Sequence, residues 1–179
     1  SNTDQVKVTV ATTPIVTASN DEVICRGESV GLSVSATGGT SPYTYTWSPS
    51  GVLTGVNTAT PIAKPNVTTT FSVTVIDANG CKGSDQMTVT VNPTVTVNAG
   101  TDKTICVGNS VQLTANASTT GTAPFTYAWT PSTGLSATDI LRPFANPTST
   151  TTYYLTTSDA NGCNKTDTVV VNVNPKPSI

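Results

Sequence analysis

The sequence predicts an all-β chain built from two tandem β-sandwich repeats, and three observations support this prediction. Only 10% of the 179 residues are charged, whereas 38 are threonine, a residue that suits a pleated, half-buried surface. The 13 glycines and 12 prolines interrupt the chain at short intervals, as turns between short strands require. Finally, a segment of about 80 residues occurs twice, and apolar residues within it alternate with polar ones.

The repeat is defined by motifs that recur in the same order. Trp47 and Trp129 are separated by the same interval as Cys81 and Cys163, so the two copies stay in register over most of their length. The matching segments are Ile24–Leu32 with Ile105–Leu113, Pro42–Pro49 with Pro124–Pro131, Thr68–Phe71 with Thr150–Tyr153, and Asp77–Cys81 with Asp159–Cys163.

The repeat also sets the expected domain boundaries. Residues 14–93 and 94–175 are two complete repeats, and residues 176–179 begin a following one. Residues Thr3–Val10 match Ser84–Val91, the last strand of a repeat, so residues 1–13 are expected to be the final strand of a preceding repeat or an extended leader. The alternative is a donor strand that completes a neighbouring subunit.

Seven strands are expected in each repeat. Val30, Leu32 and Val34 share one face of a strand, with polar residues opposite, which is the pattern of antiparallel sheets that are buried on one side only. This arrangement predicts two immunoglobulin-like seven-stranded sandwiches joined end to end in a rod, with Trp47 and Trp129 as core anchors. The expected strands of the first repeat cover residues 15–19, 29–36, 43–48, 52–57, 58–63, 70–77 and 85–92.

Taken together, the motifs resemble the immunoglobulin-like and PKD-like tandem repeats of large secreted Bacteroidota surface proteins. That group includes gliding adhesins and proteins exported by type IX secretion, and the resemblance covers both repeats. It implies β-sandwich modules that space or present adhesive and enzymatic domains outside the cell.

The four cysteines predict disulfides, because they recur at repeat positions in a chain that has no histidine. Each repeat has one cysteine before its second strand and one at the turn before its last strand. A bridge between repeats, Cys25–Cys163, would leave Cys81 and Cys106 for the preceding and following repeats. The alternative pairs Cys25 with Cys81 and Cys106 with Cys163, although these positions are expected at opposite poles of a sandwich.

No catalytic constellation or cofactor motif is present in the sequence. Without histidine, neither a Ser-His-Asp nor a Cys-His arrangement can form. Asp77 with Asn79, and Asp159 with Asn161, are weak calcium candidates, but one carboxylate per turn favours turn capping. The sequence therefore predicts no enzyme, no metal site and no cofactor.

Charge and hydropathy narrow the range of partners. A net charge of −2 and a pI of about 4.8 argue against nucleic acid, and no apolar run of about 18 residues could enter a membrane. The predicted function is a structural spacer or fibre segment of an extracellular, cell-surface or adhesin-like protein, with neighbouring repeats or head-to-tail subunits as partners. The alternative is a module that binds glycans or another surface through loops at residues 38–41 and 118–123.

Overall fold

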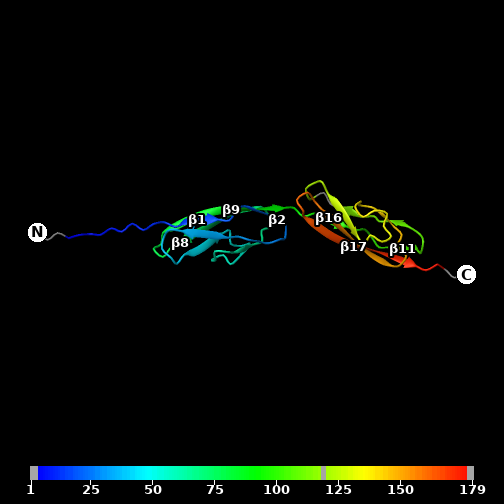
Figure 1. Cartoon of the computed structure of the whole chain (residues 1–179), viewed down its shortest axis with the longest axis horizontal. Coiled ribbons are helices and arrows are strands. Elements are labelled where there is room, and N and C mark those ends of the chain that lie inside the picture. Colours follow the sequence, from blue (N-terminus) through cyan, green and yellow to red (C-terminus); the bar gives the residue numbers. More distant parts are fainter. Residues whose placement is uncertain (1–3, 118–119, 177–179) are drawn as a thin grey trace. The chain divides into compact units, whose positions relative to one another are not determined.

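The computed structural model describes residues 4–117 and 120–176 of the chain. The chain divides into two compact units, Ser1–Val91 and Asn92–Ile179, and strands are the only regular elements in the described residues (Figure 1). Residues 1–3, residues 118–119 of the second candidate loop, and residues 177–179 of the expected following repeat lie outside the described part.

Unit 1 contains a four-stranded sheet in the order β2-β9-β8-β5 (Figure 1). A three-stranded sheet, β3-β7-β6, and a two-stranded sheet, β1-β4, complete the unit. Strands β8 and β9 form its longest antiparallel pair, in which Phe71 lies opposite Met87. The strands are β1 (Ile15–Ala18), β2 (Glu22–Cys25), β3 (Val30–Gly31), β4 (Val34–Thr37), β5 (Thr44–Ser48), β6 (Leu53–Thr54), β7 (Ile62–Ala63), β8 (Thr69–Ile76) and β9 (Lys82–Asn92).

Unit 2 repeats this design. Its four-stranded sheet has the order β11-β17-β16-β14, and β10-β13 and β12-β15 are two-stranded sheets. The pairing of β11 with β17 is parallel, whereas β16 pairs with β17 and β14 antiparallel. The strands are β10 (Val97–Asn98), β11 (Lys103–Cys106), β12 (Val111–Gln112), β13 (Asn116–Ala117), β14 (Thr126–Thr130), β15 (Phe144–Ala145), β16 (Thr151–Ser158) and β17 (Asn164–Asn174).

Each unit has a core of its own, centred on one tryptophan. Trp47 is 1% exposed and Trp129 is 2% exposed. In both units the indole Nε1 donates a hydrogen bond of 3.0 Å to a loop carbonyl, that of Thr58 in unit 1 and that of Ile140 in unit 2. A buried indole therefore has its only polar group satisfied, and the same contact fixes the loop that covers it.

One polar group in the core of unit 2 has no partner among the described residues. Thr157 is fully buried in β16, and its hydroxyl has no hydrogen-bond partner. The repeat places Val75, also fully buried, at the matching position of unit 1. Unit 2 thus carries an unsatisfied hydroxyl where unit 1 has a methyl group.

The expected strand over residues 29–36 is interrupted in the structure. It divides into β3 and β4, with Leu32 and Ser33 between them. The amides of Leu32 and Val34 still donate to the carbonyls of Pro61 and Ala59, at 2.9 Å each. The hydrogen bonding therefore continues across the break, but the proline in the partner segment prevents a regular ladder.

Sequence reasoning missed strands β2 and β11. The predicted first strand ends at residue 19, yet the chain goes on to form β2, which joins the four-stranded sheet beside β9. The first strand is thus split, with β1 in one sheet and β2 in the other. The only signal in the sequence was a short alternation over residues 22–25. In the structure Val23 is 64% exposed and Ile24 is 8% exposed.

Residues 4–13 form no strand with the described residues of this chain (Figure 1). Val6, Val8 and Val10 are 86%, 81% and 87% exposed. Their counterparts in β9 include Met87 and Val89, which are 2% and 0% exposed. The identity of this segment as the last strand of a preceding repeat stays a prediction.

Gly83 is required by a close approach of the chain to itself. A Cβ at this position of β9 would overlap the carbonyl oxygen of Pro14 and lie 2.8 Å from Cγ2 of Val16. By contrast, a Cβ at Gly31 of β3 would meet nothing within 4 Å. Glycine at position 83 thus allows the segment entering β1 to pack directly on β9.

Candidate functional site: the cysteine-bearing ends of the units

The turn before β9 is held by a single carboxylate. Oδ1 of Asp77 accepts hydrogen bonds from the backbone amides of Asn79 (3.0 Å) and Cys81 (2.8 Å). Its Oδ2 accepts one from the amide of Thr40 at 2.9 Å, and the Asn79 side chain donates to the Thr40 hydroxyl at 2.8 Å. The carboxylate therefore fastens the turn to the neighbouring loop and sets the position of Cys81.

Unit 2 uses the same construction. Oδ1 of Asp159 accepts from the amides of Asn161 (3.0 Å) and Cys163 (2.9 Å), and its Oδ2 accepts from Thr122 (3.0 Å). These oxygens face N–H donors, which is the geometry of a turn cap rather than of a cation site. Among the described residues, no group of three or more Cys, Asp or Glu side chains is placed to hold a metal ion.

These contacts shift the acidity of both carboxyls. Burial by itself would raise the pKa of Asp77, but four backbone N–H groups outweigh it, so the pKa lies below its ordinary value. For Asp159 the largest cause is the amide of Thr122, with burial opposing it, and the pKa is again lowered. Both turns are therefore built around an ionised carboxylate.

The two cysteines of unit 2 lie at opposite ends of one strand. Cys163 directly precedes β17, whereas Cys106 is in register with Asn174, the last residue of β17. At about 3.4 Å per residue, these positions are roughly 35 Å apart. Bridged cysteines require Cα atoms within about 7 Å of each other, far less than the length of this strand.

The cysteines exist in two states. Cys25 and Cys163 are disulfide-bonded. Cys81 is a half-buried free thiol and Cys106 is an exposed free thiol. Each unit therefore carries one oxidised and one reduced cysteine, and the oxidised one is at the end of β2 in unit 1 but before β17 in unit 2.

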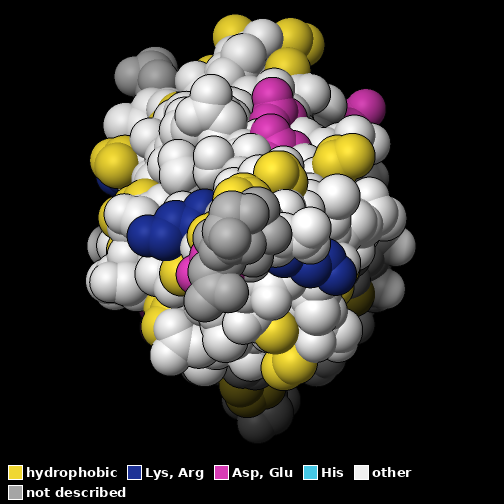
Figure 2. Space-filling model, turned by 90° about the vertical axis from the view of Figure 1, so that its left-hand side faces the viewer, with side chains coloured by type: hydrophobic (Ala, Val, Ile, Leu, Met, Phe, Trp, Pro, Cys, Tyr) yellow, Lys and Arg dark blue, Asp and Glu magenta, His cyan; other side chains and the backbone are white. Residues whose placement is uncertain are grey.

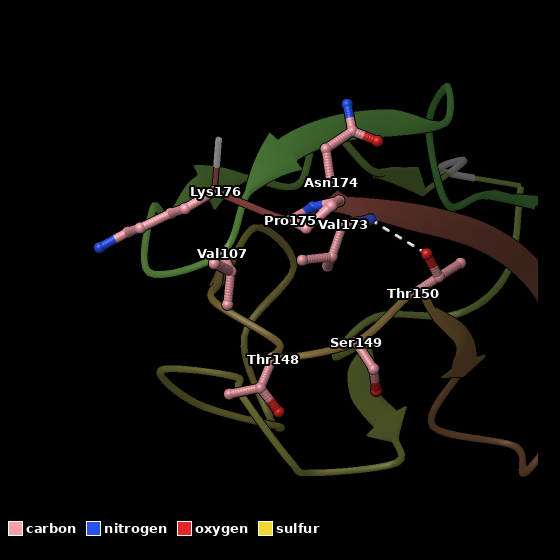
Figure 3. A pocket seen from close by; sticks show the side chains of 8 residues that line it. All are labelled: Val107, Thr148, Ser149, Thr150, Val173, Asn174, Pro175 and Lys176. Atoms are coloured by element: carbon pink, nitrogen blue, oxygen red, sulfur yellow. Dashed lines mark hydrogen bonds between the residues drawn. The ribbon is translucent and has the colours of Figure 1, made fainter. Parts of the chain in front are cut away.

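An open hollow of about 380 Å³ lies beside Cys106 at the end of unit 2 (Figure 3). Val107, Val173 and Pro175 supply apolar lining, and Thr150 accepts a hydrogen bond of 3.0 Å from the amide of Val173. The amide of Val107 donates to the carbonyl of Asn174 at 2.9 Å, which keeps the end of β11 against β17. The remaining lining residues are Thr148, Ser149, Asn174 and Lys176.

Most other carboxylates are also engaged with the backbone. Asp85 accepts from the amide of Ala18 at 2.8 Å, and Asp167 accepts from Ala99 at the same distance. The amides of Ala18 and Gln86 lower the pKa of Asp85, with burial opposing them. Within the described part, backbone amides also donate to the carboxylates of Asp21, Glu28 and Asp102.

The surface offers no broad apolar or charged patch in the view of Figure 2. Hydrophobic side chains lie singly or in small groups, among side chains that are neither charged nor hydrophobic. The described part of the chain also contains no helix that could cross a membrane.

In each unit the first strand is split between two sheets, and the buried tryptophan lies on an edge strand of the four-stranded sheet, β5 or β14. These features define each unit as an immunoglobulin-like β-sandwich. Consistent with this class, residues 93–177 match the family described as Ig-like domain CHU_C associated. Unit 1 has the same order of strands and the same core, and so belongs to the same structural class.

Known proteins provide three further comparisons. The chain is similar to a decoration protein of Escherichia phage T5, at 42% identity over 75 residues, which cover 39% of this chain and 46% of that protein. The match thus spans less than half of the relative. Among solved structures, an I-band fragment of titin has a TM-score of 0.47 at 14% identity, covering 93% of this chain and 67% of its own. The insect immune protein hemolin has a TM-score of 0.48 at 15% identity, covering 90% and 47%.

Proposed function

We propose that the chain is a non-enzymatic structural segment of a longer extracellular protein, in which immunoglobulin-like units space other parts of that protein. The observation that carries this proposal is that most acidic side chains of the chain bind its own backbone. Seven of the 10 acidic side chains accept hydrogen bonds from backbone amides within the described residues. These groups hold turns and strand edges in both units, so they are committed to stability and not to chemistry on a substrate.

A disulfide supports the extracellular part of the proposal, because disulfides persist in oxidising compartments. The polar surface, which consists mainly of hydroxyl and amide groups, is also compatible with an extracellular environment. The finer context, a cell-surface adhesin exported by type IX secretion in Bacteroidota, follows from the motif resemblance alone and is part of the proposal.

The proposal includes a covalent staple between the repeats, Cys25–Cys163. Two observations support it. Cys25 and Cys163 are oxidised whereas Cys81 and Cys106 are free. In addition, Cys106 and Cys163 lie too far apart along β17 to bond to each other within unit 2. Such a staple would restrict bending at the short link near residues 92–93 and make the segment a stiffer spacer.

Peptide mapping without reductant tests the staple directly. The expected result is a cross-linked peptide that contains Cys25 and Cys163, with Cys81 and Cys106 available to alkylation. A peptide joining Cys25 to Cys81 would overturn the proposed pairing. Small-angle scattering tests the mechanical consequence: the C25S/C163S double variant should sample a wider range of dimensions than the oxidised chain, and identical profiles would contradict a stiffening role.

A second function, attachment to a large surface, is favoured by the similarity to the phage decoration protein. In this interpretation a unit binds a glycan or another surface and is displayed on it. The exposed loop at residues 38–41 is the candidate contact. Glycan arrays and co-sedimentation with intact cells would test it: binding in either assay would favour this function over the spacer, and no binding in both would count against it.

A further inference from the structure

We propose that Cys106 and the hollow beside it receive the Asp77–Cys81 turn of a second copy, and that a Cys106–Cys81 disulfide joins copies head to tail. This inference rests on the proposed structural function and names its partner. It gives the two free thiols a partner in a second copy, where the sequence expectation gave them one in the preceding and following repeats.

The repeat identifies the pair of positions that bond. Cys106 occupies in unit 2 the position that Cys25 occupies in unit 1, and Cys81 occupies the position of Cys163. Cys25 and Cys163 are both oxidised, whereas their counterparts Cys106 and Cys81 are both free. Each of the two repeat positions therefore holds a bonded cysteine in one unit and a free thiol in the other.

The end of unit 2 provides a surface on which a partner can rest. Val107 and Val173 face the hollow in Figure 3, whereas Lys176 extends away from it. Cys106 directly precedes Val107 in the chain and is in register with Asn174, and both of these neighbours line the hollow. An apolar floor next to an exposed thiol favours docking before bond formation.

Unit 1 differs at the matching place. There Arg26 replaces Val107, and its Nε donates a hydrogen bond of 3.2 Å to the carbonyl of Asn66. Asn66 corresponds in the repeat to Thr148, which lines the hollow in unit 2. The Arg26 side chain therefore joins two segments of unit 1 by a hydrogen bond. In unit 2 a valine side chain cannot donate this bond, and the matching segments line the open hollow near the free thiol.

The turn of unit 1 is shaped to enter such a hollow. Ala78, Asn79 and Gly80 are exposed at its tip, and a Cβ at Gly80 would meet nothing within 4 Å, so a partner backbone can come close. The Asp77 cap holds the turn in one conformation, which reduces the entropy lost on docking. The identical turn of unit 2 is not available, because Cys163 is oxidised and 1% exposed.

The bond forms by thiol–disulfide exchange with a small extracellular disulfide such as glutathione disulfide. The Cys106 thiolate attacks one sulfur of that disulfide and releases one small thiol, giving a mixed disulfide on Cys106. The Cys81 thiolate of the docked copy then attacks the Cys106 sulfur and releases the second small thiol. Two protein thiols are oxidised, one small disulfide is reduced, and two protons leave with the small thiols. Because the contact is heterologous, repetition gives an open chain of copies, or a ring where the rotation between copies closes.

The test incubates the full chain with glutathione disulfide, followed by non-reducing electrophoresis and peptide mapping. We expect a ladder of covalent oligomers in which Cys81–Cys106 peptides exceed Cys81–Cys81 and Cys106–Cys106 peptides by about tenfold, because docking raises the effective concentration of one pairing. The C106S and C81S variants should stop at dimers. V107E should slow the ladder about fivefold while leaving the Cys106 thiol intact, and V23E, a change at an exposed valine outside the hollow, should leave the rate unchanged.

Three results would overturn the inference: no oligomers, statistical pairing of the two cysteines, or a monomer in which Cys81 is bonded to Cys106 of the same chain. The same peptide map distinguishes failure of the head-to-tail link from failure of the Cys25–Cys163 staple. If the Cys25–Cys163 peptide is present and the ladder is absent, only the head-to-tail link is wrong. If the Cys25–Cys163 peptide is itself absent, the proposed staple is wrong.

Discussion

Replacing Trp47 by alanine should strongly destabilise unit 1 and leave the stability of unit 2 unchanged. Trp47 is 1% exposed, and its side chain packs in a core whose buried members all belong to unit 1. The substitution removes an indole and leaves a cavity, which costs about 3–5 kcal/mol for a buried tryptophan. It also leaves the Thr58 carbonyl without the 3.0 Å hydrogen bond that it accepts from the indole.

That loss is large in relation to the stability of a small unit. At about 0.05–0.15 kcal/mol per residue, a repeat of about 80 residues has roughly 4–12 kcal/mol of total stability. For a domain of this size, each kcal/mol corresponds to roughly 4–8 °C in melting temperature. Unit 1 should therefore melt tens of degrees earlier in W47A than in the parent chain.

The chain contains its own reporter for this experiment, because its two tryptophans are Trp47 and Trp129, one in each unit. In W47A, fluorescence comes from Trp129 alone and should retain the transition of unit 2, while circular dichroism shows an additional early transition. W129A is the mirror-image control. Reductant present throughout removes any covalent coupling. A Trp129 transition that moves down together with the circular dichroism would show that the units unfold as one.

Three further predictions follow from individual positions. T157V should stabilise unit 2 by about 1 kcal/mol, measured by denaturant unfolding of Trp129 fluorescence, because it removes an unsatisfied buried hydroxyl and restores the valine found at position 75. The folded-state pKa of Asp77 is lowered, so its contribution is complete above the ordinary value of 3.8 and is lost as pH falls through the folded pKa; D77N should flatten the acid limb of a pH–stability curve. G83A should cost about 1–3 kcal/mol through overlap with the chain entering β1, whereas G31A, where the space is open, should change stability far less; equal effects would contradict the close-packing argument.

The fold class could be predicted from sequence because the repeat reports the same pattern twice. The alternation of Phe71, Val73 and Val75 extends over a long strand, and β8 covers residues 69–76 where residues 70–77 were expected. The break between β3 and β4 could not be predicted, because it depends on which carbonyls of residues 59–61 accept hydrogen bonds from the strand. Strand β2 was missed because four residues carry too short a period, and its place in the sheet depends on a pairing distant in sequence.

The residues of the candidate site could be predicted from the sequence, but not all of their contacts. The Asp77–Cys81 turn was recognised as a motif, and its carboxylate was expected to cap the turn. The contact to Thr40 was not foreseen, since it joins positions 37 residues apart. The two oxidised cysteines are those that the predicted bridge between the repeats would join, and the bridge itself stays a prediction.

The amide-bound carboxylates have a consequence for the environments in which this protein can work. Exposed ion pairs weaken when dissolved electrolyte shields them, whereas a carboxylate bound at 2.8–3.0 Å by peptide N–H groups is shielded far less. With only 10% of its residues charged, the chain relies little on long-range charge attraction. Electrostatic screening should therefore change the stability of its folded state little, from dilute fresh water to sea water.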